Sequence, residues 1–183
     1  MDAPAEVTVG APRAERTLRW IVVAVALAAL AVLFYPRRAP EREPRPGGFL
    51  VDAEGRPVQV TSELAPLTLV HFWATWCPPC RTELPELVRY ARERGATDPR
   101  VLFVAVGDDV EAARDFLGAG ELRLLFDPAW EVAHRFRTGR LPETHLVLDG
   151  KVVHTFVGAT AWSDAAIRRE VQKWSASPAS AAP

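Results

Sequence analysis

The hydrophobic pattern divides the chain into one isolated apolar block and a longer region with the periodicities of regular secondary structure. The block, residues 20–35, contains no charged side chain. Two later apolar runs, 67–73 and 101–106, are rich in β-branched and aromatic residues. Runs of this length and composition predict strands that are buried on both faces of a sheet.

Shorter strands are predicted on either side of these runs. Residues 49–60 predict a hairpin, because apolar residues flank a turn at 52–55. Residues 144–148 and 151–157 predict a second hairpin, because Asp-Gly at 149–150 is typical of a two-residue turn.

Helices are predicted where apolar residues recur every three or four positions. The first begins around Pro78 and ends near Gly95, and Pro85 inside it should kink it. Three more are predicted at 110–117, at 127–136 with Asp127-Pro128 as the start, and at 167–174. The order hairpin, strand, helix, strand, two helices, hairpin, helix predicts an α/β fold with a central mixed sheet and helices on both faces.

The apolar block at 20–35 predicts one transmembrane helix. Its 16 residues would rise about 24 Å, somewhat short of a hydrocarbon core of about 30 Å, but Trp20 and Tyr35 suit the two interfaces. A cleaved signal peptide is the alternative. The bulky Phe34-Tyr35-Pro36 stands where a small-x-small cleavage site would be, which favours an uncleaved anchor.

Composition adds boundaries and excludes one class of partner. With 22 basic and 23 acidic residues, the chain has a formal net charge of -1, so no nucleic-acid partner is predicted. The predicted divisions are an N-terminal tail 1–19, the anchor 20–35, a linker rich in proline and charge 36–48, a globular domain 49–175 and a C-terminal tail 176–183.

Cys77 and Cys80 are the only cysteines in the chain. A disulfide that closes so short a loop stabilises a fold very little, so we interpret the pair as a redox dithiol. Cys77, at the amino end of the predicted helix, is the expected attacking sulfur, because the helix dipole favours a thiolate there. Cys80 is the expected resolving sulfur. Because both intervening residues are prolines, no donor side chain lies between the sulfurs, which favours a reducing or mild role.

Glu83 follows Cys80 by one helical turn, where a carboxylate can accept the proton of the resolving thiol. The alternative is an ordinary solvated glutamate. A zinc site would need two further ligands, and the histidines are scattered without ligand spacing, so no metal and no cofactor are predicted. Two alternatives to the enzyme stay open, a redox-inactive peptide-binding module and a copper-handling protein, since thiolates suit Cu(I).

Residues 72–85, Phe-Trp-Ala-Thr-Trp-Cys-Pro-Pro-Cys-Arg-Thr-Glu-Leu-Pro, resemble the active-site signature of the membrane-anchored thioredoxin-like proteins of the TlpA, ResA and CcmG type. The similarity covers about residues 49–174. It implies a thioredoxin-like fold with an N-terminal β-hairpin extension. By this resemblance Glu83 would be the active-site acid and Pro142 a cis-proline beside the disulfide. Trp76 and Pro142 are the candidate substrate-binding residues.

The resemblance also implies a function and a location. The chain would be a protein thiol-disulfide oxidoreductase that reduces disulfides in extracytoplasmic proteins, as in cytochrome c maturation. Its partners would be apocytochrome c or copper-centre proteins, and a membrane electron donor would re-reduce it. A single-pass anchor would hold the domain on the periplasmic side of a bacterial cytoplasmic membrane. His71 stands where thioredoxin has a buried aspartate, and we expect His71 and His145 to be core histidines.

Overall fold

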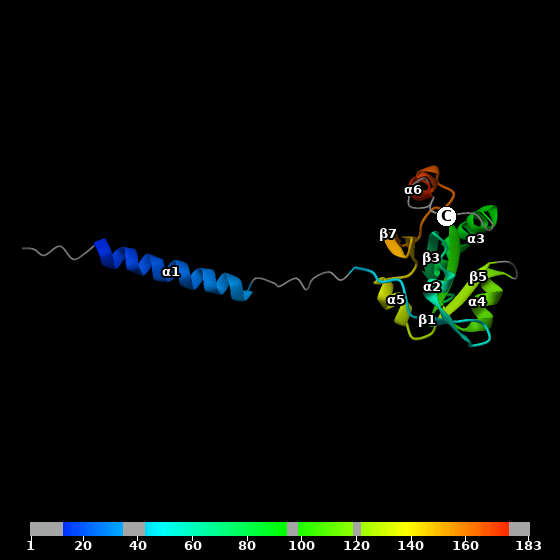
Figure 1. Cartoon of the computed structure of the whole chain (residues 1–183), viewed down its shortest axis with the longest axis horizontal. Helices are drawn as coiled ribbons and strands as arrows, with labels where there is room; N and C mark the ends of the chain where they lie inside the picture. The colour runs from blue at the N-terminus through cyan, green and yellow to red at the C-terminus, as the bar shows by residue number, and fades with distance from the viewer. Residues whose placement is uncertain (1–12, 35–42, 95–98, 119–121, 176–183) are drawn as a thin grey trace, which may run out of the picture. The chain divides into compact units, whose positions relative to one another are not determined.

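The computed structural model describes residues 13–34, 43–94, 99–118 and 122–175. The chain forms two compact units, Met1–Arg42 and Glu43–Pro183 (Figure 1). The predicted C-terminal tail, and most of the predicted N-terminal tail and linker, lie outside the described residues.

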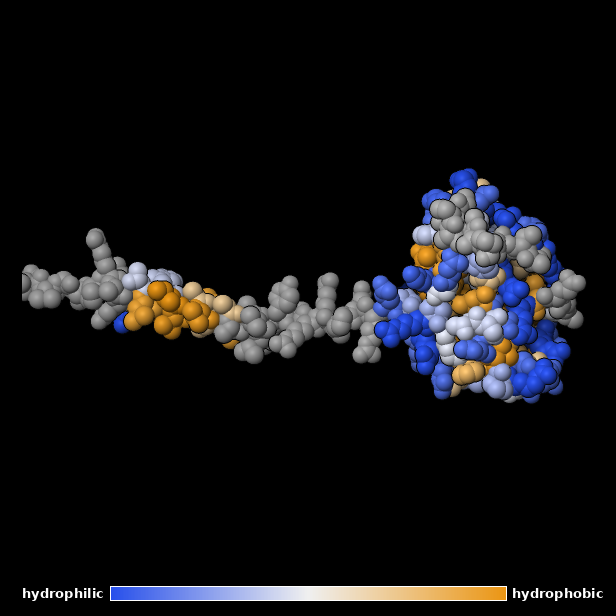
Figure 2. Space-filling model, viewed as in Figure 1, coloured by the Kyte–Doolittle hydropathy of each residue, from blue (hydrophilic) through white to orange (hydrophobic). Residues whose placement is uncertain are grey.

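The described residues of the first unit form one helix, α1 (Arg13–Phe34), which includes most of the apolar block. Leu18, Trp20 and Leu27 are among its exposed apolar side chains, and Figure 2 shows apolar residues along the helix. Across the described ranges, no helix combines the length and apolarity needed to cross a membrane. The predicted transmembrane helix is therefore not confirmed.

The second unit is built on a seven-stranded mixed sheet in the order β2-β1-β5-β4-β3-β6-β7. Strands β3, β4 and β5 are parallel, and the remaining neighbours are antiparallel. All seven residues of β3 are buried, as a central strand covered on both faces requires. The strands are β1 (Phe49–Val51), β2 (Pro57–Gln59), β3 (Leu67–Trp73), β4 (Arg100–Val106), β5 (Arg123–Asp127), β6 (Glu143–Leu148) and β7 (Lys151–Val157).

Helices cover both faces of this sheet, and each face has its own apolar core. One core contains side chains of α3, α4 and α6 and the other contains side chains of α2 and α5. The predicted arrangement of a mixed sheet between helices is thus confirmed. The helices are α2 (Val60–Glu63), α3 (Pro78–Arg94), α4 (Val110–Leu117), α5 (Glu131–Phe136) and α6 (Ala165–Ser175).

Three local predictions were wrong. The strand β5 was missed, because it is only five residues long and its apolar residues follow Arg123 directly. The helix expected to start at Asp127-Pro128 starts at Glu131, since Asp127 is the last residue of β5; its carboxylate nevertheless accepts the N–H of Ala133 at 2.8 Å. Val60 was assigned to the first hairpin and instead begins α2.

Candidate functional site

A disulfide joins Cys77 and Cys80 where β3 gives way to α3, with the two sulfurs 2.07 Å apart. The N–H of Cys77 donates to the carbonyl of Ala74 at 3.2 Å, which turns the chain out of the strand. Helix α3 then begins at Pro78, and Pro79 follows. Neither proline interrupts the helix, because the N–H groups of a first turn have no intrahelical acceptor. The cysteines therefore lie at a helix N-terminus, as predicted.

The two sulfurs differ in access. Cys77 is 4% exposed, whereas Cys80 is completely buried. The backbone N–H of Cys80 points to the sulfur of Cys77 at 3.3 Å. This donor and the amino end of α3 both favour negative charge on Cys77 once the disulfide is reduced. A partner can therefore reach Cys77, and Cys80 lies behind it.

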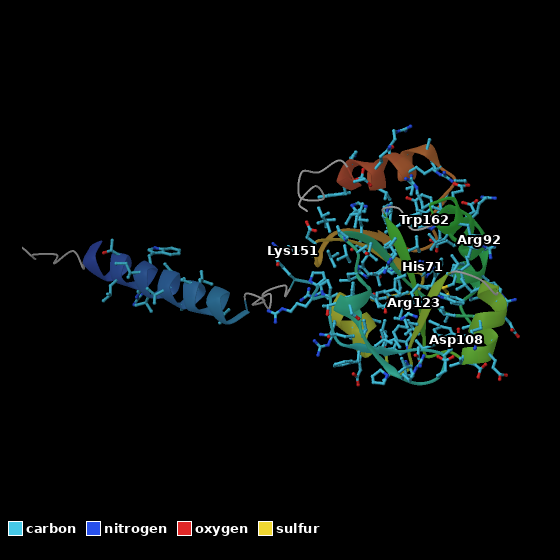
Figure 3. The ribbon with its side chains drawn as sticks, turned by 45° about the vertical axis from the view of Figure 1, so that its right-hand side comes forward. His71, Arg92, Asp108, Arg123, Lys151 and Trp162 are labelled. Atoms are coloured by element: carbon cyan, nitrogen blue, oxygen red, sulfur yellow. A yellow bond between two sulfur atoms is a disulfide. The ribbon has the colours of Figure 1, made fainter. Side chains whose placement is uncertain are left out.

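The loop that carries Cys77 is fixed to the end of the neighbouring strand β4. Asp108, labelled in Figure 3, accepts the N–H of Thr75 at 2.5 Å and its hydroxyl at 2.6 Å. The indole N–H of Trp76 donates to the carbonyl of Gly107 at 3.0 Å. Trp76 is still 55% exposed, so this predicted substrate-binding residue presents its ring to solvent next to the reactive sulfur.

The predicted cis-proline is present, since the bond between Leu141 and Pro142 is cis. The carbonyl of Pro142 accepts the N–H of Gly158 at 2.9 Å. Phe72 of β3 is paired with Glu143, the first residue of β6. Pro142 therefore lies beside the end of β3, the strand that leads to the disulfide. Its contact with a substrate stays a prediction.

Glu83 is a buried carboxylate in α3 and not a solvated one. It is 4% exposed, and one oxygen accepts the indole N–H of Trp162 at 2.5 Å (Figure 3). Its other oxygen is buried without a hydrogen bond of ordinary geometry. Burial raises the pKa of Glu83 to about 7, against the opposing effect of Trp162. A group with this pKa can both hold and release a proton near neutrality.

The two histidines singled out in the sequence are both buried. The ring of His145 lies between the hydroxyls of Thr138 and Thr155, at 2.9 and 3.0 Å. His71 contacts the hydroxyl of Thr144 at 2.8 Å, but its Nε2 is buried without a partner. Desolvation lowers the pKa of His71 to about 3, so its ring is neutral. Both are core histidines, and only one ring nitrogen of His71 has a hydrogen-bond partner.

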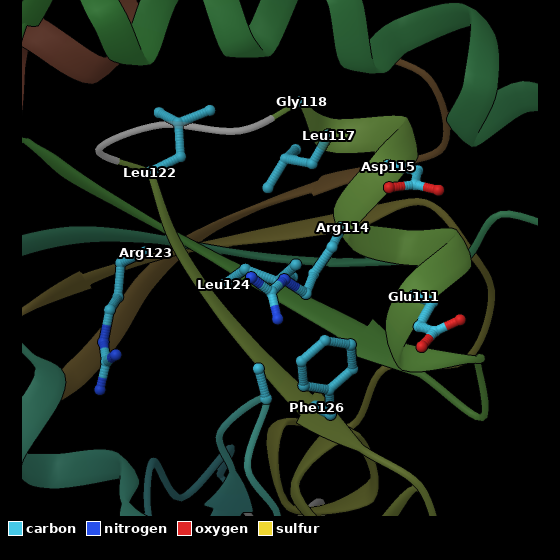
Figure 4. Close-up of a pocket in the computed structure, with 10 residues that line it drawn as sticks. Glu111, Arg114, Asp115, Leu117, Gly118, Leu122, Arg123, Leu124 and Phe126 are labelled. Carbon is cyan, nitrogen blue, oxygen red and sulfur yellow. The ribbon is translucent and has the colours of Figure 1, made fainter.

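No cluster of three or more metal-ligating side chains occurs within the described part of the chain. A cavity of about 790 Å³ lies along α4 and β5, and Figure 4 shows Leu117, Leu124 and Phe126 lining it. None of the predicted site residues lines this cavity, so the redox site lies elsewhere, at the carboxyl ends of the parallel strands.

The sequence profile of the family described as Redoxin matches residues 38–169. The chain belongs to the Redoxin family. It is 30% identical over 158 residues to a thiol:disulfide interchange protein DsbE of Allochromatium vinosum, which covers 79% of this chain and 87% of that one. It is 28% identical over 160 residues to a thiol-disulfide oxidoreductase ResA of Geobacillus thermodenitrificans, which covers 80% and 90%.

A solved structure of a thio-disulfide isomerase from Thermus thermophilus has a TM-score of 0.57 and 29% identity, over 74% of this chain and 96% of that one. These similarities confirm the predicted thioredoxin-like fold and the predicted enzyme class, a protein thiol-disulfide oxidoreductase. The disulfide between Cys77 and Cys80 lies within the residues that match the Redoxin profile.

Sequence reasoning missed three side chains that shape the site. Trp162 lies 79 positions from Glu83, and no local pattern links the two. Asp108 lies two positions after the end of β4, a buried strand that is parallel to β3; the rule that carboxyl ends of parallel strands meet at one edge could have indicated it. The third, Trp130, packs against Trp76 with ring centroids 6.3 Å apart.

Proposed function

We propose that this Redoxin-family chain reduces disulfides in partner proteins. The thiolate of Cys77 attacks one sulfur of the partner disulfide, and the other partner sulfur leaves as a thiolate that takes up a proton. Cys80 then attacks Cys77 in the mixed disulfide, which releases the second partner thiol. Two electrons and two protons pass from the dithiol to the partner, and the disulfide between Cys77 and Cys80 is restored.

The observation that carries this order of attack is the difference in access between the sulfurs. Cys77 keeps 4% exposure and its sulfur accepts the N–H of Cys80, whereas Cys80 is completely buried. A large disulfide-bonded protein therefore contacts Cys77 first. The resolving step needs only the short approach that the two cysteines already make.

We propose that the carboxylate of Glu83 accepts the proton of the Cys80 thiol. Glu83 lies one turn after Cys80 on α3, and it is bonded to Trp162, which belongs to the same apolar core as Cys80. Because its pKa is raised to about 7, the carboxylate can take the proton when Cys80 attacks and pass it on afterwards. The bond from Trp162 fixes the orientation of the carboxylate.

The finer biological setting belongs to the same proposal. A charge-free block at 20–35 supports anchoring in a bacterial cytoplasmic membrane with the domain on the extracytoplasmic side. Thiols in such partners serve haem attachment or copper binding, so apocytochrome c and copper-centre proteins are the proposed substrates. A membrane electron donor would restore the dithiol after each cycle.

The test is the reduction of insulin by dithiothreitol, catalysed by the full-length chain. Cys77→Ser should abolish catalysis. In a separate experiment without dithiothreitol, pre-reduced Cys80→Ser should accumulate a mixed disulfide with extracytoplasmic proteins, whose partner is identified by mass spectrometry. A Cys77→Ser protein as active as the wild type would refute the reaction. The direction is tested by equilibration with glutathione: a potential near about −120 mV, typical of a strong oxidant, would contradict the reducing role.

A further inference from the structure

Exposed apolar side chains of the second unit lie at one end of the sheet, where the parallel strands β3, β4 and β5 finish. Among its described residues, the large ones are Phe49, Trp76 and Val157. Trp76 follows β3, and Val157 pairs with Glu143 at the start of β6. Phe49 begins β1, which runs antiparallel to β5 and so starts where β5 ends at Asp127. Cys77, which follows Trp76 directly in the chain, lies at this same end of the strands.

Trp130 is held at the same end of the sheet in an unfavourable backbone conformation. It lies between β5 and α5 with φ 62° and ψ 15°, in the left-handed region. Bulky residues seldom adopt this conformation, and such outliers concentrate at functional sites. Gly107 makes room for the ring, because a Cβ on Gly107 would lie 2.9 Å from the indole nitrogen of Trp130. Two independent features, a strained backbone and a glycine, thus serve the position of one indole.

The indole of Trp130 extends the exposed ring of Trp76 into a larger surface. The two ring centroids are 6.3 Å apart and the ring planes are inclined by 35°. The ring of Trp130 also lies 6.3 Å from the ring of His134, at 32°. We call Trp76, Trp130 and His134 the aromatic face. It runs from the residue next to Cys77 across the ends of β4 and β5 to α5.

We propose that the aromatic face binds an aromatic side chain of the partner polypeptide whose cysteine is joined to Cys77. This inference rests on the proposed function and adds a specificity determinant to it. The ends of β3 and β5 are two strand spacings apart, about 10 Å, which an extended chain spans with about three residues. The recognised aromatic residue therefore lies about three positions from the partner cysteine. The opposite flank of that cysteine runs toward Pro142.

An aromatic ring suits this surface better than a cation. Offset or edge-on stacking on an indole stabilises an aromatic side chain without a counter-ion. Asp108 is the carboxylate bonded to the loop of Trp76, and both its oxygens already accept hydrogen bonds from Thr75, with a further one from the N–H of Asp109. These three bonds use most of the roughly four acceptor sites of the carboxylate, so a bound cation would compete with the loop for it.

The test uses the reduced full-length chain and three peptides, each linked through its cysteine to thionitrobenzoate as a mixed disulfide. They carry phenylalanine, arginine or alanine three positions from the cysteine. The measured quantity is the ratio of kcat/KM between peptides, followed by thionitrobenzoate release. For the wild type we expect a preference of about five- to tenfold for phenylalanine over alanine.

Trp130→Gly and Trp130→Asn remove the ring and keep a residue suited to the left-handed region. Both should reduce the preference to about one, and Trp130→Phe should restore most of it. Arg137→Gly is the matched control, because Arg137 has the same left-handed conformation at the other end of α5. Its backbone N–H donates to the carbonyl of His134 at 3.1 Å, and glycine keeps this bond. It should keep the wild-type preference.

Several outcomes would overturn the inference alone: equal rates of the wild type on all three peptides, a preference for arginine, or an unchanged preference in Trp130→Gly. A wild type that dimerises at assay concentration and becomes monomeric in Trp130→Gly would also overturn it, because a second copy would then be the occupant. Failure of the wild type to reduce any peptide, or glutathione disulfide, would instead overturn the proposed function.

Discussion

Replacing Glu83 with glutamine should change how the stability of the protein depends on pH. In the folded chain burial raises the pKa of Glu83 from 4.5 to about 7. Between these values the folded chain holds a proton that the unfolded chain has lost, so the free energy of unfolding falls as pH rises. At about 1.4 kcal/mol per pKa unit, the full loss is about 3 kcal/mol by pH 8.

His71 acts in the opposite direction in the wild type. Desolvation lowers its pKa from 6.5 to about 3, so in this window the unfolded chain binds the extra proton and stability rises with pH. The two effects offset each other where the windows overlap, roughly between pH 4.5 and 6.5. In Glu83→Gln the free energy of unfolding should therefore increase with pH in this window, because only the effect of His71 remains.

The assay is urea unfolding of the oxidised protein from pH 4.5 to 8, since the disulfide keeps both cysteines out of the titration. The free energy of unfolding of Glu83→Gln minus that of the wild type should increase by about 3 kcal/mol from the lowest to the highest pH. Glu170→Gln is the control, because a hydrogen bond from Lys173 lowers the pKa of Glu170, so this variant should not gain stability over the wild type as pH rises. A stability difference for Glu83→Gln that stays constant with pH would refute the reasoning.

Three further predictions follow from contacts around the disulfide. Asp108→Ala leaves the N–H and hydroxyl of Thr75 without their acceptor and should lower the free energy of unfolding by about 2 kcal/mol, measured in urea. Gly107→Ala forces a side chain into the left-handed region and against Trp130; calorimetry should show a loss of about 2 kcal/mol or more. Glu83→Gln should slow release of the second partner thiol at least tenfold, by stopped-flow, with mixed-disulfide formation largely retained.

The sequence was most informative where one residue type has one structural use. A buried strand at 67–73 followed by two cysteines and two prolines predicts a redox pair at a helix start, and the structure has this arrangement. Asp149-Gly150 likewise predicts the hairpin between β6 and β7, because both residues adopt positive φ. In each case the local chain alone determines the conformation.

Contacts between segments that are distant in the chain could not be predicted from the local sequence. The strand β5 is short and begins with an arginine, so its periodicity is weak, and only pairing with β4 and β1 defines it. Glu83 gives no local sign of burial, because the indole that covers it belongs to Trp162 beyond β7. Trp130 occupies a position where backbone preference favours glycine or asparagine, and tertiary packing overrides that preference.

The short loop between the cysteines, which are three positions apart, links redox chemistry to folding through a thermodynamic cycle. Folding and reduction can occur in either order, so the difference in unfolding free energy between oxidised and reduced protein equals the difference in reduction free energy between folded and unfolded chain. For this two-electron couple, about 30 mV corresponds to about 1.4 kcal/mol. Because closing so small a ring changes the entropy of the unfolded chain little, the difference arises mainly in the native state. Unfolding curves of the two redox forms therefore measure how far the fold itself adjusts the electron affinity of its disulfide.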